Sequence, residues 1–186
     1  MTSNVIIALI NTLILIVAIP LIGIAIDYLN KIILGFIQNI FGRKIAYIFA
    51  NRITFIGTVH HELAHALFAI ITGAKIIKIN LFKVQGDTLG SVVFNTRGNH
   101  LLKSIQLTMT SIAPVILGIV SEHLLITKVV SNVNNMVLLW IIYYIVISIL
   151  LHMTMSTQDI KNALRGLPIC TIIVYILLYI TKFSII

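Results

Sequence analysis

The sequence predicts an all-α integral membrane protein with about five transmembrane helices, an additional interfacial helix and one short β-hairpin. The first observation behind this fold class is composition: the 186 residues are 59% hydrophobic and only 10% charged, with a mean hydropathy of +1.10. A soluble domain needs more polar surface than this. The second is that apolar runs long enough to cross a bilayer recur along the chain. We therefore expect residues 1–186 to form a single membrane-embedded domain.

The distribution of charge points to a membrane surface. The net charge of +8 comes from 13 Lys and Arg against 5 Asp and Glu. The basic residues lie mostly between apolar runs, which is typical of loops at an anionic bilayer and requires no nucleic-acid partner. The N-terminus has no basic n-region and no small-residue cleavage site, so we expect a retained helix. These features predict a multi-pass protein of the cell membrane, and the abundance of Ile, Asn and Lys is typical of an AT-rich bacterial genome.

The expected elements follow the apolar runs in order. The first span ends at Asp27, and the next segment is interrupted by polar residues, which favours an interfacial helix over a full crossing. The third span contains Pro114, which is expected to kink a closely packed helix. The five predicted spans cover residues 5–26, 53–74, 105–126, 136–155 and 167–186, and the interfacial helix covers residues 31–52.

A β-hairpin is expected between the second and third spans. Isoleucine and leucine alternate with polar residues over 77–81, a Gly-Asp turn signal follows at 86–87, and two valines and a phenylalanine occupy 92–94. This alternation with a turn signal is typical of a hairpin, here expected over 81–94. The alternative is an ordinary loop with a turn.

The second span carries the motif TVHHELAHALFA at residues 58–69. On a helix, residues four apart project from nearly the same face, so His61 and His65 can bind one ion. Glu62 lies beside them, where it could take a proton from a metal-bound water. His60 faces elsewhere. The spacing is that of a zinc hydrolase, in which zinc lowers the pKa of its water to about 7 and the glutamate acts as general base.

A chance match, with these side chains satisfied by packing, is the alternative. One of only two glutamates in the chain falls between the paired histidines. A charged group at the centre of a span costs about 2.5–3.5 kcal/mol on insertion scales, and a metal site would explain why that cost is tolerated here. The single cysteine, Cys170, excludes a cysteine zinc cluster and a disulfide framework.

A catalytic zinc usually has three protein ligands, so a third must come from elsewhere in the chain. Asp159 is our choice, because in a five-span arrangement it returns to the side where the second span ends. Its alternative role is the N-cap of a short helix over 160–164. The other candidates are His152, Glu122, His123 and Asp87.

HHELAH in a membrane helix, a hairpin-like loop after it and a later Asp at a helix edge resemble the site-2 protease family of intramembrane zinc metalloproteases. The closest resemblance is to its compact bacterial branch, which lacks PDZ and CBS domains. The resemblance covers roughly residues 55–168, and only His-Glu-x-x-His is specific. It implies that His61, His65 and Asp159 bind Zn²⁺ and that Glu62 is the catalytic base. Larger members have Asp-Gly at the third ligand, whereas Ile160 follows the aspartate here.

The resemblance implies an endopeptidase that cleaves a membrane protein or peptide in or near a transmembrane segment, within the lipid bilayer. The alternative is a non-enzymatic membrane interaction or immunity-type protein that retains the metalloprotease fold. The intact motif favours the enzyme, since a degenerate copy would be expected to lose Glu62 first. A metal transporter should distribute ionisable residues over several spans. Zinc peptidases with a glutamate as third ligand have a substantial soluble part that this chain lacks.

Overall fold

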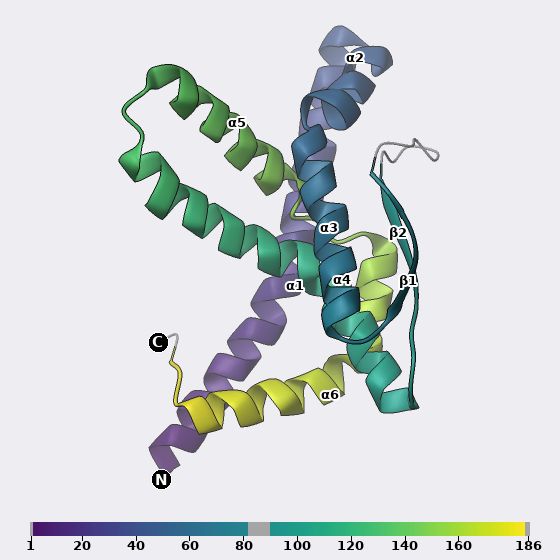
Figure 1. The fold of residues 1–186 in the computed structure, drawn as a ribbon, viewed down its shortest axis with the longest axis vertical. Coiled ribbons are helices and arrows are strands. Elements are labelled where there is room, and N and C mark those ends of the chain that lie inside the picture. The colour runs from purple at the N-terminus through teal and green to yellow at the C-terminus, as the bar shows by residue number, and fades with distance from the viewer. Residues whose placement is uncertain (1, 82–89, 185–186) are drawn as a thin grey trace.

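Helices form most of the chain, and one antiparallel hairpin lies beside them (Figure 1). The computed structural model describes residues 2–81 and 90–184. The elements are α1 (Thr2–Phe41), α2 (Arg43–Ile48), α3 (Phe55–Ile71), β1 (Lys75–Asn80), β2 (Ser91–Asn95), α4 (His100–Leu124), α5 (Met136–His152) and α6 (Thr157–Thr181). Short π-helical turns at Phe49–Ile53 and Leu125–Val129 and a 3₁₀ turn at Val130–Asn132 complete the described part.

Within residues 2–81 and 90–184, three helical segments are long and apolar enough to cross a membrane: Asn4–Phe41, His100–Asn132 and Thr157–Thr181. Helices α3 and α5 have 17 residues each. A helix of that length extends about 25 Å, which is short of the roughly 30 Å of a hydrocarbon core. The structure therefore shows three candidate spans, and the five that the sequence predicts are not shown.

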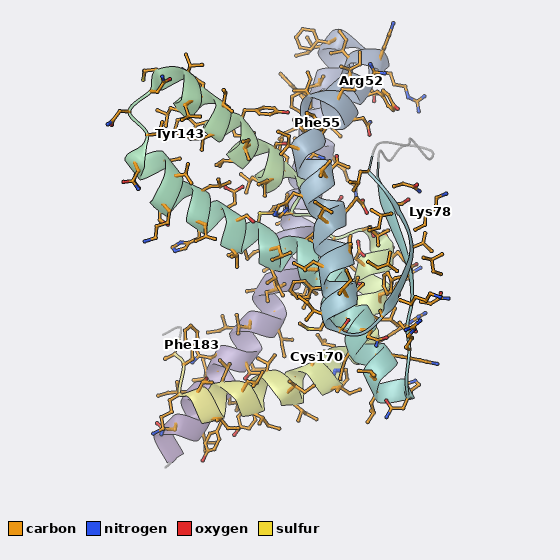
Figure 2. The ribbon with its side chains drawn as sticks, in the orientation of Figure 1. Arg52, Phe55, Lys78, Tyr143, Cys170 and Phe183 are labelled. Atoms are coloured by element: carbon orange, nitrogen blue, oxygen red, sulfur yellow. The ribbon has the colours of Figure 1, made fainter. Side chains whose placement is uncertain are left out.

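The helix surfaces are apolar, as lipid contact requires. Val137 and Trp140 on α5 are each 70% exposed. Figure 2 shows carbon-rich side chains projecting from the helices, including that of Tyr143, and from the segment after α6 at Phe183, while Lys78 projects from the hairpin. Large apolar side chains facing outward on several helices are typical of a protein whose solvent is a bilayer.

The first helix is longer than expected. The sequence predicts a span that ends at Asp27 and a separate interfacial helix over 31–52, but α1 continues without a break to Phe41. Asp27 does not end the helix because its Oδ2 lies 2.6 Å from Lys31 Nζ, one turn further along the same surface. The helix ends before Gly42, whose φ of +84° is accessible to glycine at little cost. The predicted start of the interfacial helix at residue 31 is thus wrong, and a separate helical segment begins only at α2 and continues into the π-helical turn at Phe49–Ile53.

The last helix begins earlier than the predicted span at 167–186. α6 starts at Thr157 because Ser156 is its N-cap and forms a capping box with Asp159. The short helix considered over 160–164 is therefore the first part of α6. The expected cap role belongs to Ser156, and Asp159 occupies the third helical position.

The predicted hairpin is confirmed, with different bounds. β1 pairs antiparallel with β2, from Lys75 opposite Asn95 to Asn80 opposite Ser91, with a register irregularity after Ile76. The strands begin earlier than the predicted 81–94, and the Gly-Asp turn signal at 86–87 lies outside the described residues. Figure 1 shows the hairpin running alongside α3.

Helices α4 and α6 approach each other at backbone distance. The Gly166 amide donates to Thr108 Oγ1 at 3.0 Å, and this hydroxyl donates to Ala163 O at 2.8 Å. A Cβ at Gly166 would overlap the carbonyl of Ser104. Because only glycine permits this approach, the first half of α6 packs closely against the first half of α4.

Candidate metal centre

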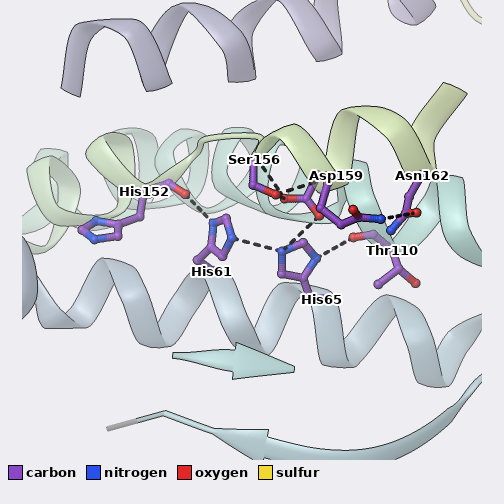
Figure 3. Close-up of polar contacts among 8 residues, drawn as sticks. His61, His65, Thr110, His152, Ser156, Asp159 and Asn162 are labelled. Carbon is purple, nitrogen blue, oxygen red and sulfur yellow. Dashed lines mark hydrogen bonds and ion pairs between the residues drawn. The ribbon is translucent and has the colours of Figure 1, made fainter. Parts of the chain in front are cut away.

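The two motif histidines of α3 and one carboxylate of α6 converge on one point (Figure 3). The Nε2 atoms of His61 and His65 are 3.0 Å apart, and His65 Nε2 lies 4.0 Å from Asp159 Oδ1. One ligand atom from each of the three residues lies within 4.8 Å of the other two. These three residues are here called the metal triad. Among residues 2–81 and 90–184, no other group of three or more His, Cys, Asp or Glu side chains is placed to hold a metal ion.

The orientation of His61 is set by the end of α5. Its Nδ1 lies 2.7 Å from the main-chain oxygen of His152. His152 is the last residue of α5, so its carbonyl has no donor within the helix. A carbonyl oxygen can only accept, so Nδ1 of His61 carries the ring proton and Nε2 has a free lone pair.

His65 is held in the same way by α4. Its Nδ1 lies 2.8 Å from the main-chain oxygen of Thr110. The ring proton of His65 is therefore also on Nδ1, and its Nε2 also has a free lone pair. Hydrogen bonds from the second ring nitrogen to a carbonyl are the usual way in which proteins orient metal-ligating histidines.

The two histidines cannot satisfy each other. Both Nε2 atoms are acceptors and face one another at 3.0 Å, so neither donates a proton to the other. A cation between them removes this repulsion. Two Zn–N bonds of about 2.0–2.1 Å at a tetrahedral angle separate the nitrogens by roughly 3.3 Å. The carboxyl end of α5, where helix carbonyls carry partial negative charge, also lies at this site. The donor set therefore fits a zinc-like ion.

Asp159 serves the helix cap and the triad with different oxygens. Its Oδ2 accepts from Ser156 N at 3.0 Å and from Ser156 Oγ at 2.6 Å. Its Oδ1 is the atom that faces His65. The N-cap role predicted as the alternative belongs to Ser156, and the capping-box bonds of Asp159 fix the carboxylate in the orientation that the triad needs.

Glu62 lies on α3 between the two histidines and is 8% exposed. Its carboxylate is close enough to that of Asp159 for the two to interact electrostatically. A Cβ placed on Gly90 would lie 2.5 Å from Glu62 Cγ and 3.1 Å from Oε1. The bare backbone before β2 therefore packs directly on the glutamate, and the hairpin covers the side chain that the motif assigns as base.

The other candidates for the third ligand lie elsewhere. The ring of His152 points away from His61 (Figure 3), donating from Nδ1 to Ser148 O at 2.9 Å and accepting the Thr58 hydroxyl at 3.1 Å. Its contribution to the site is its main-chain oxygen. Glu122 and His123, further along α4, do not belong to the triad that the described residues form. Asp87 lies outside the described residues.

A close approach between α3 and α5 brings the His152 carbonyl to His61. The Gly57 amide donates to Ser148 Oγ at 2.8 Å, and that hydroxyl donates to Thr54 O at 3.0 Å. A Cβ at Gly57 would overlap the Ser148 carbonyl and the His152 ring. Without a side chain at this position, the end of α5 rests on the helix that carries both histidines.

The groups that orient the triad are not evident from the sequence motif. The two acceptors are main-chain oxygens, which every residue carries and which give no signal of their own. Ser156 did have a signal, because Ser three residues before an acidic residue and ahead of an apolar run is typical of a capping box. No match to a protein-family model, a curated protein or a solved structure was found, so the case for this site rests on the chain's own residues.

Proposed function

We propose that this chain is a zinc endopeptidase of the cell membrane that cleaves a membrane protein or peptide in or near a transmembrane segment. The observation that carries the proposal is the convergence of two histidine lone pairs and one aspartate oxygen beside a buried glutamate. The three candidate membrane spans support the location. The resemblance of HHELAH to site-2 proteases agrees with both the metal site and the membrane location.

Each residue has a defined task in this proposal. His61 and His65 would bind the ion through Nε2, and Asp159 would bind it through Oδ1. Bound zinc supplies a water that ionises near neutral pH. Glu62 is the group that accepts a proton from water on its carboxylate and returns it to the leaving amine. Its burial beneath Gly90 limits the access of bulk water to that carboxylate.

The hairpin offers a place for the substrate. The carbonyls of a helical peptide are hydrogen-bonded, so a helix must unwind before a peptide bond can be hydrolysed. Within the described residues the sheet has two strands, so β2 has one edge that is not paired with β1. β2 begins beside Glu62. An unwound segment that pairs with this edge would lie extended next to the base.

Zinc stoichiometry is the first test. Wild-type protein purified in mild detergent should contain about one zinc per chain, and His65→Ala and Asp159→Ala should lose it. His123→Ala is the control, since this exposed histidine lies outside the triad. Zinc retained in Asp159→Ala would contradict the assignment of the third ligand. No zinc in well-folded wild-type protein would instead favour the non-enzymatic membrane interaction or immunity-type protein.

Peptidase activity is the second test. Glu62→Gln should keep the zinc and accumulate uncut substrate in membranes, because the amide cannot accept the proton. Proteomic comparison of membranes that express wild type or Glu62→Gln should reveal fragments with the wild type only. The same fragments with both proteins would refute the role of Glu62.

A further inference from the structure

One acceptor of the metal centre is an irregularity in α4. In an α-helix the carbonyl of each residue accepts from the amide four residues later. Thr110 lies well inside α4, and the residue four positions later is Pro114, which has no amide hydrogen. The Thr110 oxygen therefore lacks the main-chain donor that an α-helix normally supplies. It accepts from Nδ1 of His65 at 2.8 Å instead.

We propose that Pro114 is a positioning residue of the metal centre. Its missing N–H leaves the Thr110 oxygen to His65, and the hydrogen bond that results keeps the ring proton of His65 on Nδ1. The lone pair of Nε2 then points at His61 and Asp159. The choice of zinc as the metal rests on the proposed function. The tautomer of His65 follows from its hydrogen bond to Thr110 and does not depend on that function.

The two triad histidines thus use carbonyls freed by two different means. For His61 the helix ends at His152, and for His65 the helix continues but lacks one donor. An amide at position 114 would draw the Thr110 oxygen toward the helix axis and away from the ring. Proline inside a helix is unfavourable for the fold, so a use for the freed carbonyl explains its place here.

Packing alone does not require a proline at position 114. Pro114 is fully buried between Ala113 and Val115, which are both 0% exposed. A buried alanine there would fill nearly the same environment with a slightly smaller side chain. What distinguishes proline from alanine at this position is chiefly the absent donor, and the test can isolate that difference.

The test compares Pro114→Ala with wild type in the zinc-free protein. ¹⁵N NMR of labelled imidazoles should show His65 with the proton on Nδ1 in wild type and a mixture of tautomers in the variant. Zinc affinity, measured by chelator competition, should fall about 10–100-fold, as for other groups that orient metal ligands. Unchanged tautomer and affinity in a folded variant would overturn the proposal.

Two further variants separate the missing donor from the proline ring. L-lactic acid at position 114 gives an ester that has neither the N–H nor the ring, and it should restore the wild-type tautomer and affinity. If this ester behaves like Pro114→Ala, the proposal is wrong. Pro168→Ala is the matched control in α6, where the exposed proline is outside the triad, and it should leave both measurements unchanged.

A side-chain control completes the design. The Thr110 hydroxyl is buried and has no hydrogen-bond partner in the described part of the chain, whereas its main-chain oxygen accepts from His65. Thr110→Val should therefore keep the wild-type tautomer and zinc affinity, and a loss of either would move the effect to the hydroxyl and refute the role of the freed carbonyl. If wild type binds no zinc, the peptidase proposal fails, while the tautomer comparison still tests Pro114.

Discussion

Replacing Gly57 by alanine should weaken zinc binding without touching a ligand. The new Cβ would lie 2.7 Å from the carbonyl carbon of Ser148 and would overlap its oxygen. Ordinary carbon contacts are 3.5–4.0 Å, so α3 and α5 must separate by about 1 Å. The hydrogen bond from His61 to His152 O, now 2.7 Å, would lengthen by a similar amount and exceed hydrogen-bond range.

Two magnitudes follow from that displacement. Overpacking of this kind destabilises by about 1–3 kcal/mol, partly offset by the better helix propensity of alanine. The loss of the carbonyl that orients His61 should weaken zinc binding about 10–100-fold. The assay is chelator competition for zinc, combined with thermal unfolding in the same detergent.

Gly35→Ala is the matched control for this prediction. A Cβ at Gly35 meets no atom within 4 Å. The substitution should leave zinc affinity unchanged and stabilise the protein by about 0.5–1 kcal/mol, because glycine is unfavourable inside a helix. Zinc affinity of Gly57→Ala within twofold of wild type would refute the reasoning that the close approach orients His61.

Two other substitutions test the remaining supports of the site. Ser156→Ala removes the hydroxyl that donates to Asp159 Oδ2 and accepts from the Asp159 amide, and it leaves the main-chain bond from Ser156 N to Oδ2 in place. Zinc should therefore bind more weakly, and unfolding should cost about 1 kcal/mol less. Asn135→Ala, which removes the N-cap of α5, should give the stability loss alone, and equal zinc affinity in both variants would count against Ser156. Gly90→Val should displace Glu62 and reduce peptidase activity at least tenfold with zinc retained; full activity would show that the hairpin contact is dispensable.

The parts of the site that depend on local spacing could be predicted from sequence. The four-residue interval places His61 and His65 on one helix face whatever surrounds them, and strand alternation predicts the hairpin. Asp159 was chosen from a five-span arrangement that the structure does not show. Asp159 reaches the triad for two other reasons: α6 begins at the Ser156 cap, and α6 packs against α4 through Gly166. Neither feature is part of the five-span arrangement.

The errors in the fold share a physical origin. A charge after an apolar run predicts the end of a span, but Asp27 is paired with Lys31 on the helix surface and leaves the backbone undisturbed. Hydropathy likewise places the start of the last span near 167, whereas capping by Ser156 starts the helix at Thr157. Helix ends are decided by caps and glycine conformations, to which hydropathy is insensitive.

The length of α1 has a consequence for where a peptide would be cut. Asn30 of α1 donates to the main-chain oxygen of Leu151, at the end of α5 that borders the triad. The Asp27–Lys31 ion pair lies at nearly this level of α1, and charged groups favour the headgroup region. When residues 4–26 fill the hydrocarbon core, the triad lies near the membrane boundary. For the peptidase proposed above, a substrate helix would meet the triad at its frayed end, where unwinding costs least.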